Sequence, residues 1–374
     1  MTVYTATIQT LSPLHIGDGV ELRQDFDFVV KGNRTYRLDE DAILLSKETK
    51  LKLDKNRRYL PPGNQLDEAD FEKNEYFRYV LRGAPRSGKT YASMKSFIKD
   101  SKDRPYIPGS SLKGALRTAL AWTGWDEVKP KLDRAAVGNS KSWAGQPLER
   151  KLFGPDPNHD LLRALHVGDL SLPKRENGDE PTAGEGLLIV NAQVLTPKNA
   201  QSPIELETLP GDITFTGSIT IDDTLFSDMA EKELHFRNRR HWLSELTARA
   251  QAHSQSRIEE LLEWFEKADQ AYAGVANFYR QLKDAQLGAN QALLQLGWGS
   301  GWDGKTFGSH LQKDPALFER LIADFRMHKA GKDSPARKVG DAFPRSKRAA
   351  MTVKNKVAQA VAPFGWVLLE LTEA

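Results

Sequence analysis

A short segment near residue 110 combines residue types that suit a phosphate group. It reads YIPGSSLKGALRTAL from residue 106, so a proline and Gly109 stand directly before Ser110 and Ser111. Serine is a good N-cap residue, and the apolar side chains after it recur at helical spacing. The segment therefore predicts a helix over residues 111–122, with Ser110 or Ser111 as its N-cap. The free backbone amides of such a helix start attract anions.

Two cations extend this helix start. Lys113 and Arg117 are four residues apart, so they lie one turn apart on one face of the predicted helix. Together with the backbone at Gly109, Ser110 and Ser111 they form a candidate phosphate-binding site. The alternative is a well-capped amphipathic helix whose basic face only meets solvent.

A second candidate is the glycine-rich run GWGSGWDGKTFG at residues 297–308. Glycine lets backbone amides approach a phosphate closely, which makes Gly299 a candidate contact. The rings of Trp298, Trp302 and Phe307 are suited to stacking on bases, and Lys305 to neutralising a phosphate. We expect at least one aromatic side chain of this run in the core, because glycine-rich turns also pack their aromatics inward.

The net charge of +3 hides a strongly uneven distribution. Residues 82–117 hold nine Lys or Arg against two acids, and residues 326–356 hold ten against two, whereas residues 204–233 hold one against eight. Two basic blocks in a nearly neutral chain favour a path for a polyanion. The second block contains the segment FPRSKR, which adds three candidate contacts: Arg345, Lys347 and Arg348.

His15 lies in the loop LHIGDG after the first predicted strand. It is a candidate RNA contact and, in the alternative, the general base of an RNA-cleaving enzyme. The sequence places no partner for such chemistry. Cysteine is absent, which excludes disulfides, thiolate nucleophiles and thiolate metal ligands. The other histidines lack metal-ligand spacing, so we expect no catalytic residue, no metal and no cofactor.

Residues 83–90 read GAPRSGKT and match the phosphate-binding string of P-loop nucleoside triphosphatases. That chemistry needs a buried strand before the string and a helix after it. The preceding NEYFRYVLR is too charged for a buried strand, and the following YASMKSFIKD alternates as a strand does. A P-loop NTPase is therefore an alternative that the flanking segments disfavour.

Hydrophobic periodicity predicts interleaved strands and helices, hence an α+β fold. The predicted strands cover residues 3–11, 165–170, 186–195 and 365–371, a hairpin covers 27–37, and two further strands flank the Pro-Gly-Asp turn after residue 203. The predicted helices cover residues 39–47, 111–122 and 315–330 and a long helical region at 225–296. Residues 50–75 and 124–160 lack a steady period and are expected to be surface insertions.

The amino-acid sequences of several segments resemble those of a known family. The string P-G-S-S-x-K-G-x-x-R is similar to the signature of the RAMP superfamily, the RNA-binding proteins of CRISPR effector complexes. Further similar segments follow in order: IQTLSPLHIGDG, KLFGPDPNHDLLRALHVGDL, LQLGWGSGWDGKTFG, FPRSKR and PFGWVLLEL. Together they resemble the family of the fifth Csm subunit of type III-A CRISPR complexes.

This resemblance implies a fold that periodicity alone does not give. RAMP proteins are built on RRM-like (ferredoxin-like) folds, so we expect two such modules with helical insertions. The N-terminal module would span residues 1–200, with insertions near 50–80 and 124–160. The C-terminal module would span residues 201–374, with a helical insertion near 225–295 and the glycine-rich loop.

The resemblance also implies a function. The protein would be a non-catalytic crRNA-binding subunit that caps the crRNA 3′ end and supports crRNA maturation in antiviral defence. Its partners would be crRNA, the repeated backbone RAMP subunit and the small helical subunit. The resemblance also allows target RNA as a further ligand and a recruited host nuclease as a further partner. The alternative within the family is a RAMP endoribonuclease that trims crRNA itself.

The N-terminal sequence MTVYTATIQT has neither the basic region nor the apolar core of a signal peptide. No apolar run approaches the about 20 residues that a membrane span needs. We therefore expect a cytoplasmic protein with no membrane partner.

Overall fold

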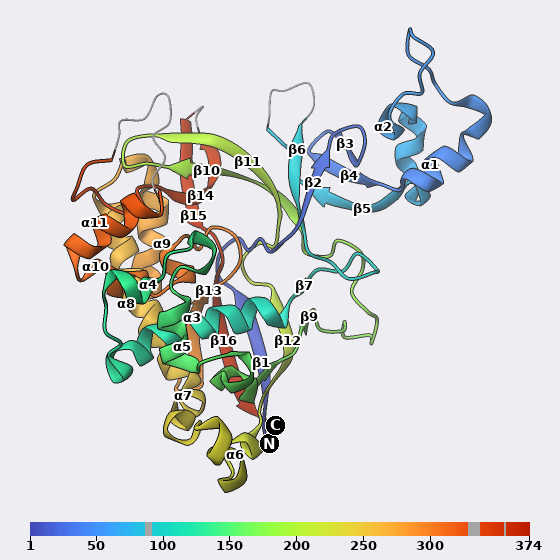
Figure 1. Cartoon of the computed structure of the whole chain (residues 1–374). Coiled ribbons are helices and arrows are strands. Elements are labelled where there is room, and N and C mark those ends of the chain that lie inside the picture. Colours follow the sequence, from blue (N-terminus) through green and yellow to red (C-terminus); the bar gives the residue numbers. More distant parts are fainter. Residues whose placement is uncertain (87–91, 328–336, 355–356) are drawn as a thin grey trace.

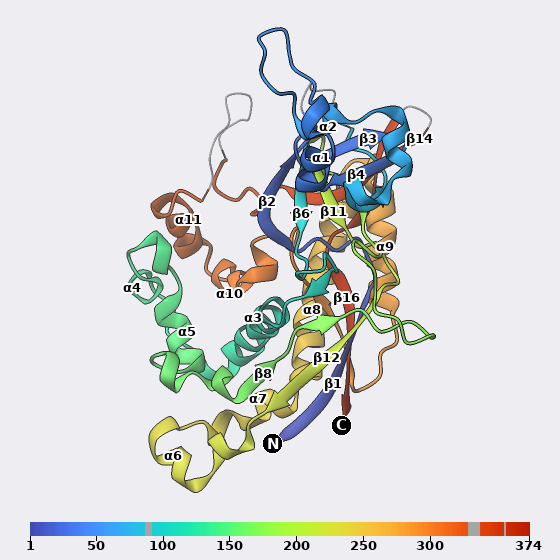
Figure 2. The same cartoon turned by 90° about the vertical axis from the view of Figure 1, so that its right-hand side faces the viewer.

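The fold is described from a computed structural model of the chain, which describes residues 1–86, 92–327, 337–354 and 357–374. Two β-sheets form its framework, and Figure 1 shows most of the helices on one side of them. The two termini lie side by side at the end of the first sheet, as both Figure 1 and Figure 2 show.

The first sheet has the strand order β13-β16-β1-β12-β9-β7, with β8 also paired to β12. Its strands are β1 (Thr2–Thr10), β7 (Tyr106–Ile107), β8 (Leu165–Val167), β9 (Leu170–Ser171), β12 (Thr214–Ile221), β13 (Gln291–Gln295) and β16 (Trp366–Glu373). Strand β1 pairs antiparallel with β12 and β16 along nearly its whole length. Its alternating side chains bury Ala6 and Ile8 on one face, which is the pattern that predicts a half-buried strand.

The second sheet has the order β2-β6-β11-β10-β5-β4-β3, with β14 paired to β10 and β15 to β14. Its strands are β2 (Gly17–Arg23), β3 (Phe28–Lys31), β4 (Arg34–Leu38), β5 (Phe77–Arg82), β6 (Ser93–Phe97), β10 (Leu188–Leu195), β11 (Ala200–Thr208), β14 (Lys347–Lys354) and β15 (Val357–Pro363). The predicted hairpin at 27–37 is the β3–β4 pair. The β10–β11 hairpin has its turn at residues 196–199.

The α-helices are α1 (Glu40–Ser46), α2 (Pro62–Gln65), α3 (Gly109–Val128), α4 (Arg134–Val137), α5 (Gln146–Phe153), α6 (Asp228–Leu234), α7 (Arg240–Ser244), α8 (Leu246–Glu266), α9 (Ala273–Asp284), α10 (Gly308–Gln312) and α11 (Pro315–Asp324). Short 3₁₀ turns join several of them, including Asp303–Lys305 within the glycine-rich loop. Helix α1 confirms the helix predicted over 39–47, and Asp39 caps it by accepting a hydrogen bond from the backbone of Ala42.

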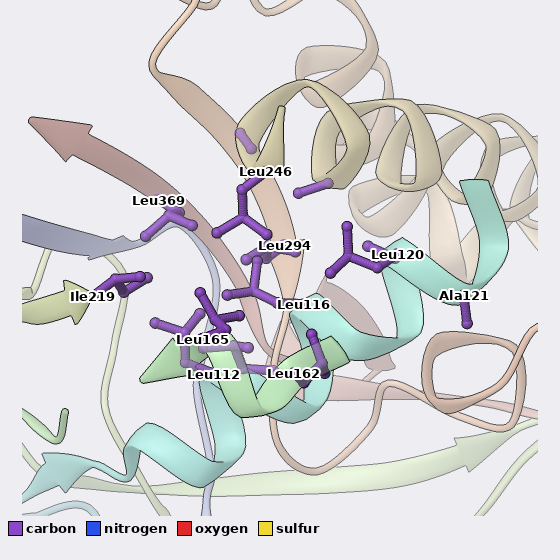
Figure 3. Close-up of a cluster of buried hydrophobic side chains, with 14 of the residues drawn as sticks. Leu112, Leu116, Leu120, Ala121, Leu162, Leu165, Ile219, Leu246, Leu294 and Leu369 are labelled. Atoms are coloured by element: carbon purple, nitrogen blue, oxygen red, sulfur yellow. The ribbon is translucent and has the colours of Figure 1, made fainter. Parts of the chain in front are cut away.

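Helix α3 packs its apolar stripe onto the first sheet. Leu112, Leu116 and Leu120 are spaced by four residues and are fully buried against residues such as Ile219 of β12 and Leu369 of β16 (Figure 3). Burial of three leucines in this stripe stabilises the fold by several kcal/mol, at about 1.5–3 kcal/mol for each side chain. The helix is thereby held firmly enough to position the polar side chains on its other faces.

The structure corrects several predicted elements. The helical region predicted over 225–296 ends earlier, because β13 occupies its last residues. The basic segment after residue 346 forms the β14–β15 hairpin, which was not predicted. The helix predicted over 315–330 is shorter and ends at Asp324.

The two strands that flank the Pro-Gly-Asp turn are confirmed as β11 and β12, but they do not pair with each other. Strand β11 belongs to the second sheet and β12 to the first. Both sheets therefore contain strands from each side of residue 200, and the boundary between modules at 200/201 stays a prediction. Among the described residues, none of the helices has the length and apolar character needed to cross a membrane.

Candidate nucleic-acid interface

A cleft of about 1310 Å³ opens among the helices. Its walls come from α3, α5, the turn between β10 and β11, the glycine-rich loop, helices α10 and α11, and residues 343–348 around the start of β14. Figure 2 shows α3, α4, α5, α10 and α11 gathered around this part of the molecule. We refer to it below as the cleft.

The cleft brings together residues that the sequence analysis found in three separate segments. Six of the predicted contact residues line it: Arg117, Trp302, Lys305, Phe307, Arg345 and Arg348. They come from the predicted basic helix, the glycine-rich loop and the FPRSKR segment. More than two hundred residues of chain separate the first from the last, so only the tertiary fold makes them neighbours.

The charge of the cleft wall is strongly positive. Lys141, Lys198 and Arg326 add to the four predicted cations, so among the described residues seven Lys or Arg side chains line the cleft against one acid, Glu149. Lys141, Lys198, Lys305, Arg326 and Arg348 are exposed. Such a wall attracts a polyanion. Lys141 and Lys198 are not evident from the sequence, because each stands outside the two basic blocks, whereas Arg326 lies in the second block.

The aromatic part of the cleft centres on Trp302. Its ring lies 5.7 Å from the ring of Phe318 and 5.1 Å from that of Phe343, measured between centroids. A Cβ atom at position 308 would come within 2.1 Å of the Trp302 ring, so Gly308 is what allows the ring to lie there. Trp302 is half-buried and lines the cleft, which suits a ring that stacks on an entering base.

Phe307 has a different environment. It is 7% exposed, and its ring centroid lies 5.2 Å from that of Trp125 on α3. Most of its surface therefore belongs to the core, which confirms the expectation that at least one aromatic of this loop is a core residue. Its remaining surface contributes to the apolar floor of the cleft.

Arg117 lines the cleft but is already paired. Its guanidinium lies 2.8 Å from Asp160 and 3.1 Å from Glu149, and it stacks on the ring of Phe153 at 4.1 Å from the centroid. These contacts hold α3 against the segment 146–160. An RNA phosphate at Arg117 would have to compete with two carboxylates.

The start of α3 is occupied by the protein itself. The backbone amide of Gly109 donates to Asp169 Oδ1 at 2.7 Å, so a carboxylate lies where a phosphate was predicted. The helix begins at Gly109 with Pro108 as its N-cap, and the prediction of Ser110 or Ser111 as N-cap is wrong. A Cβ atom on Gly109 would come within 2.2 Å of the Val167 carbonyl, so close packing requires this glycine.

The remaining residues of the predicted helix site do not line the cleft. Ser110 is exposed, while Ser111 and Lys113 are half-buried. Burial lowers the pKa of Lys113, and the nearby Asp160 opposes this shift. RNA contacts of Gly109, Ser110, Ser111 and Lys113 are expectations from the sequence that the structure does not test, and the carboxylate at the helix start disfavours them.

Lys347 and Gly299 do not line the cleft. They lie beside it and are directed towards the interior of the protein. Lys347 Nζ lies 3.7 Å from Asp303 Oδ2, and burial lowers the pKa of Lys347 while Asp303 opposes the shift. Gly299 has a φ of 95°, and a Cβ there would meet the Phe364 side chain at 2.7 Å. Packing thus explains this glycine without a phosphate.

Arg348 does face the cleft. Its guanidinium carbon lies 5.0 Å from the ring centroid of Trp298, over the face of the indole. Trp298 in turn lies edge-on to Phe364, with centroids 5.1 Å apart. The cation–π contact orients the Arg348 side chain while its charge remains available, because an indole ring does not neutralise it.

His15 is buried, with 1% of its surface exposed. Its Nδ1 lies 2.7 Å from the carbonyl oxygen of Glu207, and its ring packs edge-on against Phe97 and Trp298. Burial lowers the pKa of His15, which keeps the ring neutral. The expectation that this side chain faces bound RNA is corrected, because the ring lies inside the protein against Phe97 of β6 and Trp298 of the glycine-rich loop.

The P-loop-like string lies partly outside the described residues, which include Gly83 to Arg86 but not Lys89. Strand β5 ends at Arg82, and the next described element is strand β6 from Ser93. A P-loop is followed directly by a helix. The next described element here is a strand, which disfavours nucleotide binding by this segment.

Comparisons with known proteins agree with this fold. A family profile described as the RAMP superfamily matches residues 7–308. A relative from Methanocaldococcus jannaschii, named CRISPR system Cms protein Csm5, is 25% identical over 396 aligned residues, which cover 98% of this chain and 88% of the relative.

Two solved structures are similar over nearly the whole chain. One is a chain of a Csm–crRNA–target RNA ternary complex from a type III-A CRISPR-Cas system, with a TM-score of 0.70 and 23% identity over 98% of this chain and 100% of that chain. The other is the crystal structure of Csm5 from T. onnurineus, with a TM-score of 0.61 and 22% identity over 96% and 99%. The predicted α+β fold with helical insertions is confirmed.

Proposed function

The chain belongs to the RAMP superfamily, and we propose that it acts as the crRNA-binding fifth subunit of a type III-A CRISPR (Csm) effector complex. A relative that carries the name Csm5 spans nearly the whole chain and supports this assignment. A chain of the same fold in a Csm complex with crRNA and target RNA supports it further.

The observation that carries the proposal is the convergence of separate segments on one basic cleft. The sequence predicts Lys305, Arg345 and Arg348 as RNA contacts, and all three line the cleft. Half-buried Trp302 lies among them. Cations that bind phosphates, placed beside an aromatic ring that stacks on a base, form a combination that binds single-stranded RNA independently of its sequence.

The position within the complex belongs to the proposal as well. The protein caps the 3′ end of the crRNA, packs on the last copy of the repeated backbone subunit and contacts the small helical subunit. Target RNA approaches in the assembled complex, and a separate host nuclease trims the crRNA. The cytoplasm is the proposed location.

The proposed role is non-catalytic. The only candidate general base from the sequence, His15, is buried and bonded to the Glu207 carbonyl. A general base must reach the proton that it removes, within about 2.6–3.2 Å or through one water. This placement supports binding rather than cleavage by the chain itself.

The test uses the purified protein and labelled single-stranded RNAs of unrelated sequence. We expect binding of similar affinity to all of them, no cleavage with or without Mg²⁺, and recovery of crRNA when the protein is co-expressed with the other Csm subunits. Absence of RNA binding at low salt would refute the proposal. Specific cleavage that disappears in His15→Ala would favour the endoribonuclease instead.

A further inference from the structure

The glycine-rich loop is held from below by an ion-pair cluster of two buried side chains and one partly buried side chain. Asp303 of that loop stands between Arg257 of α8 and Lys347 of β14, with 3.7 Å from Asp303 Oδ2 to each of Arg257 Nη1 and Lys347 Nζ. The side chains of Arg257 and Asp303 are 7% and 8% exposed, and that of Lys347 is 18% exposed. We call these three residues the Asp303 cluster.

Arg257 holds the loop at a second point. Its Nη2 donates to the carbonyl oxygen of Ser300 at 3.2 Å and to Gln295 Oε1 at 3.1 Å. Gln312 Nε2 also reaches Asp303 Oδ1, at 3.4 Å. One guanidinium on α8 therefore connects to the loop at residues 300 and 303, and the helical insertion fixes the loop through it.

The Asp303 cluster lies on the inner side of the turn at residues 303–305, and the cleft lies on its outer side. In the 3₁₀ turn Asp303–Lys305, the Asp303 side chain is buried while Lys305 is exposed and lines the cleft. Trp302 precedes the turn and also lines the cleft, and its carbonyl accepts the Lys305 amide at 3.1 Å. An anchor at Asp303 therefore sets where both contact side chains point.

We propose that Asp303, held by Arg257 and Lys347, is a positioning residue for the nucleic-acid site. It acts through Trp302 and Lys305 and does not itself touch the ligand. This inference rests on the proposed function, since it takes RNA to be the occupant of the cleft.

Two physical effects of neutralising Asp303 have opposite signs, which makes the inference testable. An acid close to an anion site repels the anion, so its removal alone would tighten RNA binding. Loss of Asp303 also leaves buried Arg257 and partly buried Lys347 with the exposed Glu260 as their nearby acid, and removing one partner of a buried ion pair is unfavourable. The two cations then separate, and the loop between them shifts.

The experiment measures RNA affinity and its salt dependence for the folded Asp303→Asn protein. We expect roughly tenfold weaker binding, the effect of impairing a stacking contact. The slope of log affinity against log salt should become shallower by about 0.7, one phosphate contact, although no cation has been removed. Tighter or unchanged binding with an unchanged slope overturns the inference.

Arg257→Lys is the second variant and decides the matter if Asp303→Asn does not fold. It keeps the positive charge but cannot reach Ser300, Gln295 and Asp303 together, so it should also weaken RNA binding, whereas binding equal to wild type overturns the inference. Glu149→Gln is the matched control, because it removes the acid of the cleft wall and should strengthen binding. If wild type itself binds no RNA, the proposed function fails instead.

Discussion

The start of α3 and the glycine-rich loop differ in what already occupies them. At the helix start, Asp169 accepts the Gly109 amide, and the glycine packs against the Val167 carbonyl. At the glycine-rich loop, the acid Asp303 faces inward and leaves Lys305 exposed on the cleft side. Both regions contain an acid, but only in the first does it occupy the position that a phosphate would take.

This difference shows what converts a basic, glycine-marked segment into an anion site. Amides and cations are needed in both cases, and the sequence lists them equally well. The deciding factor is where the protein's own carboxylates lie in space. Asp169 is sixty residues from Gly109 in the chain, so no local pattern reveals that it fills the site.

The largest effect should come from removing cations of the cleft. The fourfold variant Lys141→Ala, Lys198→Ala, Lys305→Ala and Arg326→Ala should weaken RNA binding roughly hundredfold at physiological salt. The salt slope should fall by about 0.7 for each lost phosphate contact. Fluorescence anisotropy across a salt series measures both quantities. If RNA affinity fell less than threefold, the cleft would be no better supported as an RNA-binding site than the start of α3.

Part of the fold could be predicted because its signals are local. The β3–β4 hairpin has two strand-like halves around a KGN turn, and α1 has an acidic N-cap before an apolar run. Strand β13 gave no such signal, because Ala292, Leu293 and Leu294 are all buried. A strand covered on both faces has no alternation, so β13 continues the apolar pattern of the helical region, and Gly288 and Asn290 before it are the only sign of a boundary.

The residues of the cleft also differ in how far local sequence patterns reveal them. Lys305, Arg345 and Arg348 stand in segments with recognisable glycine or charge patterns, so the sequence found them. Lys141 and Lys198 reach the cleft from an irregular insertion and from a hairpin turn. His15 was misplaced for the opposite reason, because a glycine loop is usually exposed, whereas here two glycine loops pack on each other.

The support beneath the cleft should be sensitive to acid. His253 of α8 is buried between Trp122 and Arg257, and burial lowers its pKa to about 3, with Arg257 and His310 acting in the same direction. In the unfolded chain His253 binds a proton near pH 6.5, whereas in the folded protein it does so only near pH 3. Its contribution to the free energy of unfolding is therefore fully present above pH 6.5 and is lost as the pH falls towards 3. The loss should be about 1.4 kcal/mol for each pH unit below 6.5.

Chemical denaturation at a series of pH values measures this effect. His253→Gln cannot take up the proton, so its stability should fall less steeply between pH 6.5 and 5 than that of wild type. Equal slopes for the two proteins would show that another group governs the acid sensitivity.

A smaller effect is expected from Asp169 itself. Asp169→Asn weakens the contact with the Gly109 amide and removes a negative charge from a helix start, which should cost about 0.5–2 kcal/mol of stability. RNA affinity should remain within twofold of wild type. If the helix start were a second phosphate site, removing the competing carboxylate would instead strengthen RNA binding, and a clear gain in affinity would restore that site.

The smallest effect should be that of Lys113→Ala. Lys113 is half-buried, does not line the cleft and lies near Asp160, which offsets its charge. We therefore expect RNA affinity within twofold of wild type and an unchanged salt slope, the same outcome as for Lys283→Ala on the exposed face of α9. Lys305→Ala, measured in parallel, should lower the slope by about one phosphate contact. If Lys113→Ala lowers the slope as Lys305→Ala does, then RNA reaches α3 beyond the cleft, and the carboxylate at Asp169 does not close the helix start to phosphate.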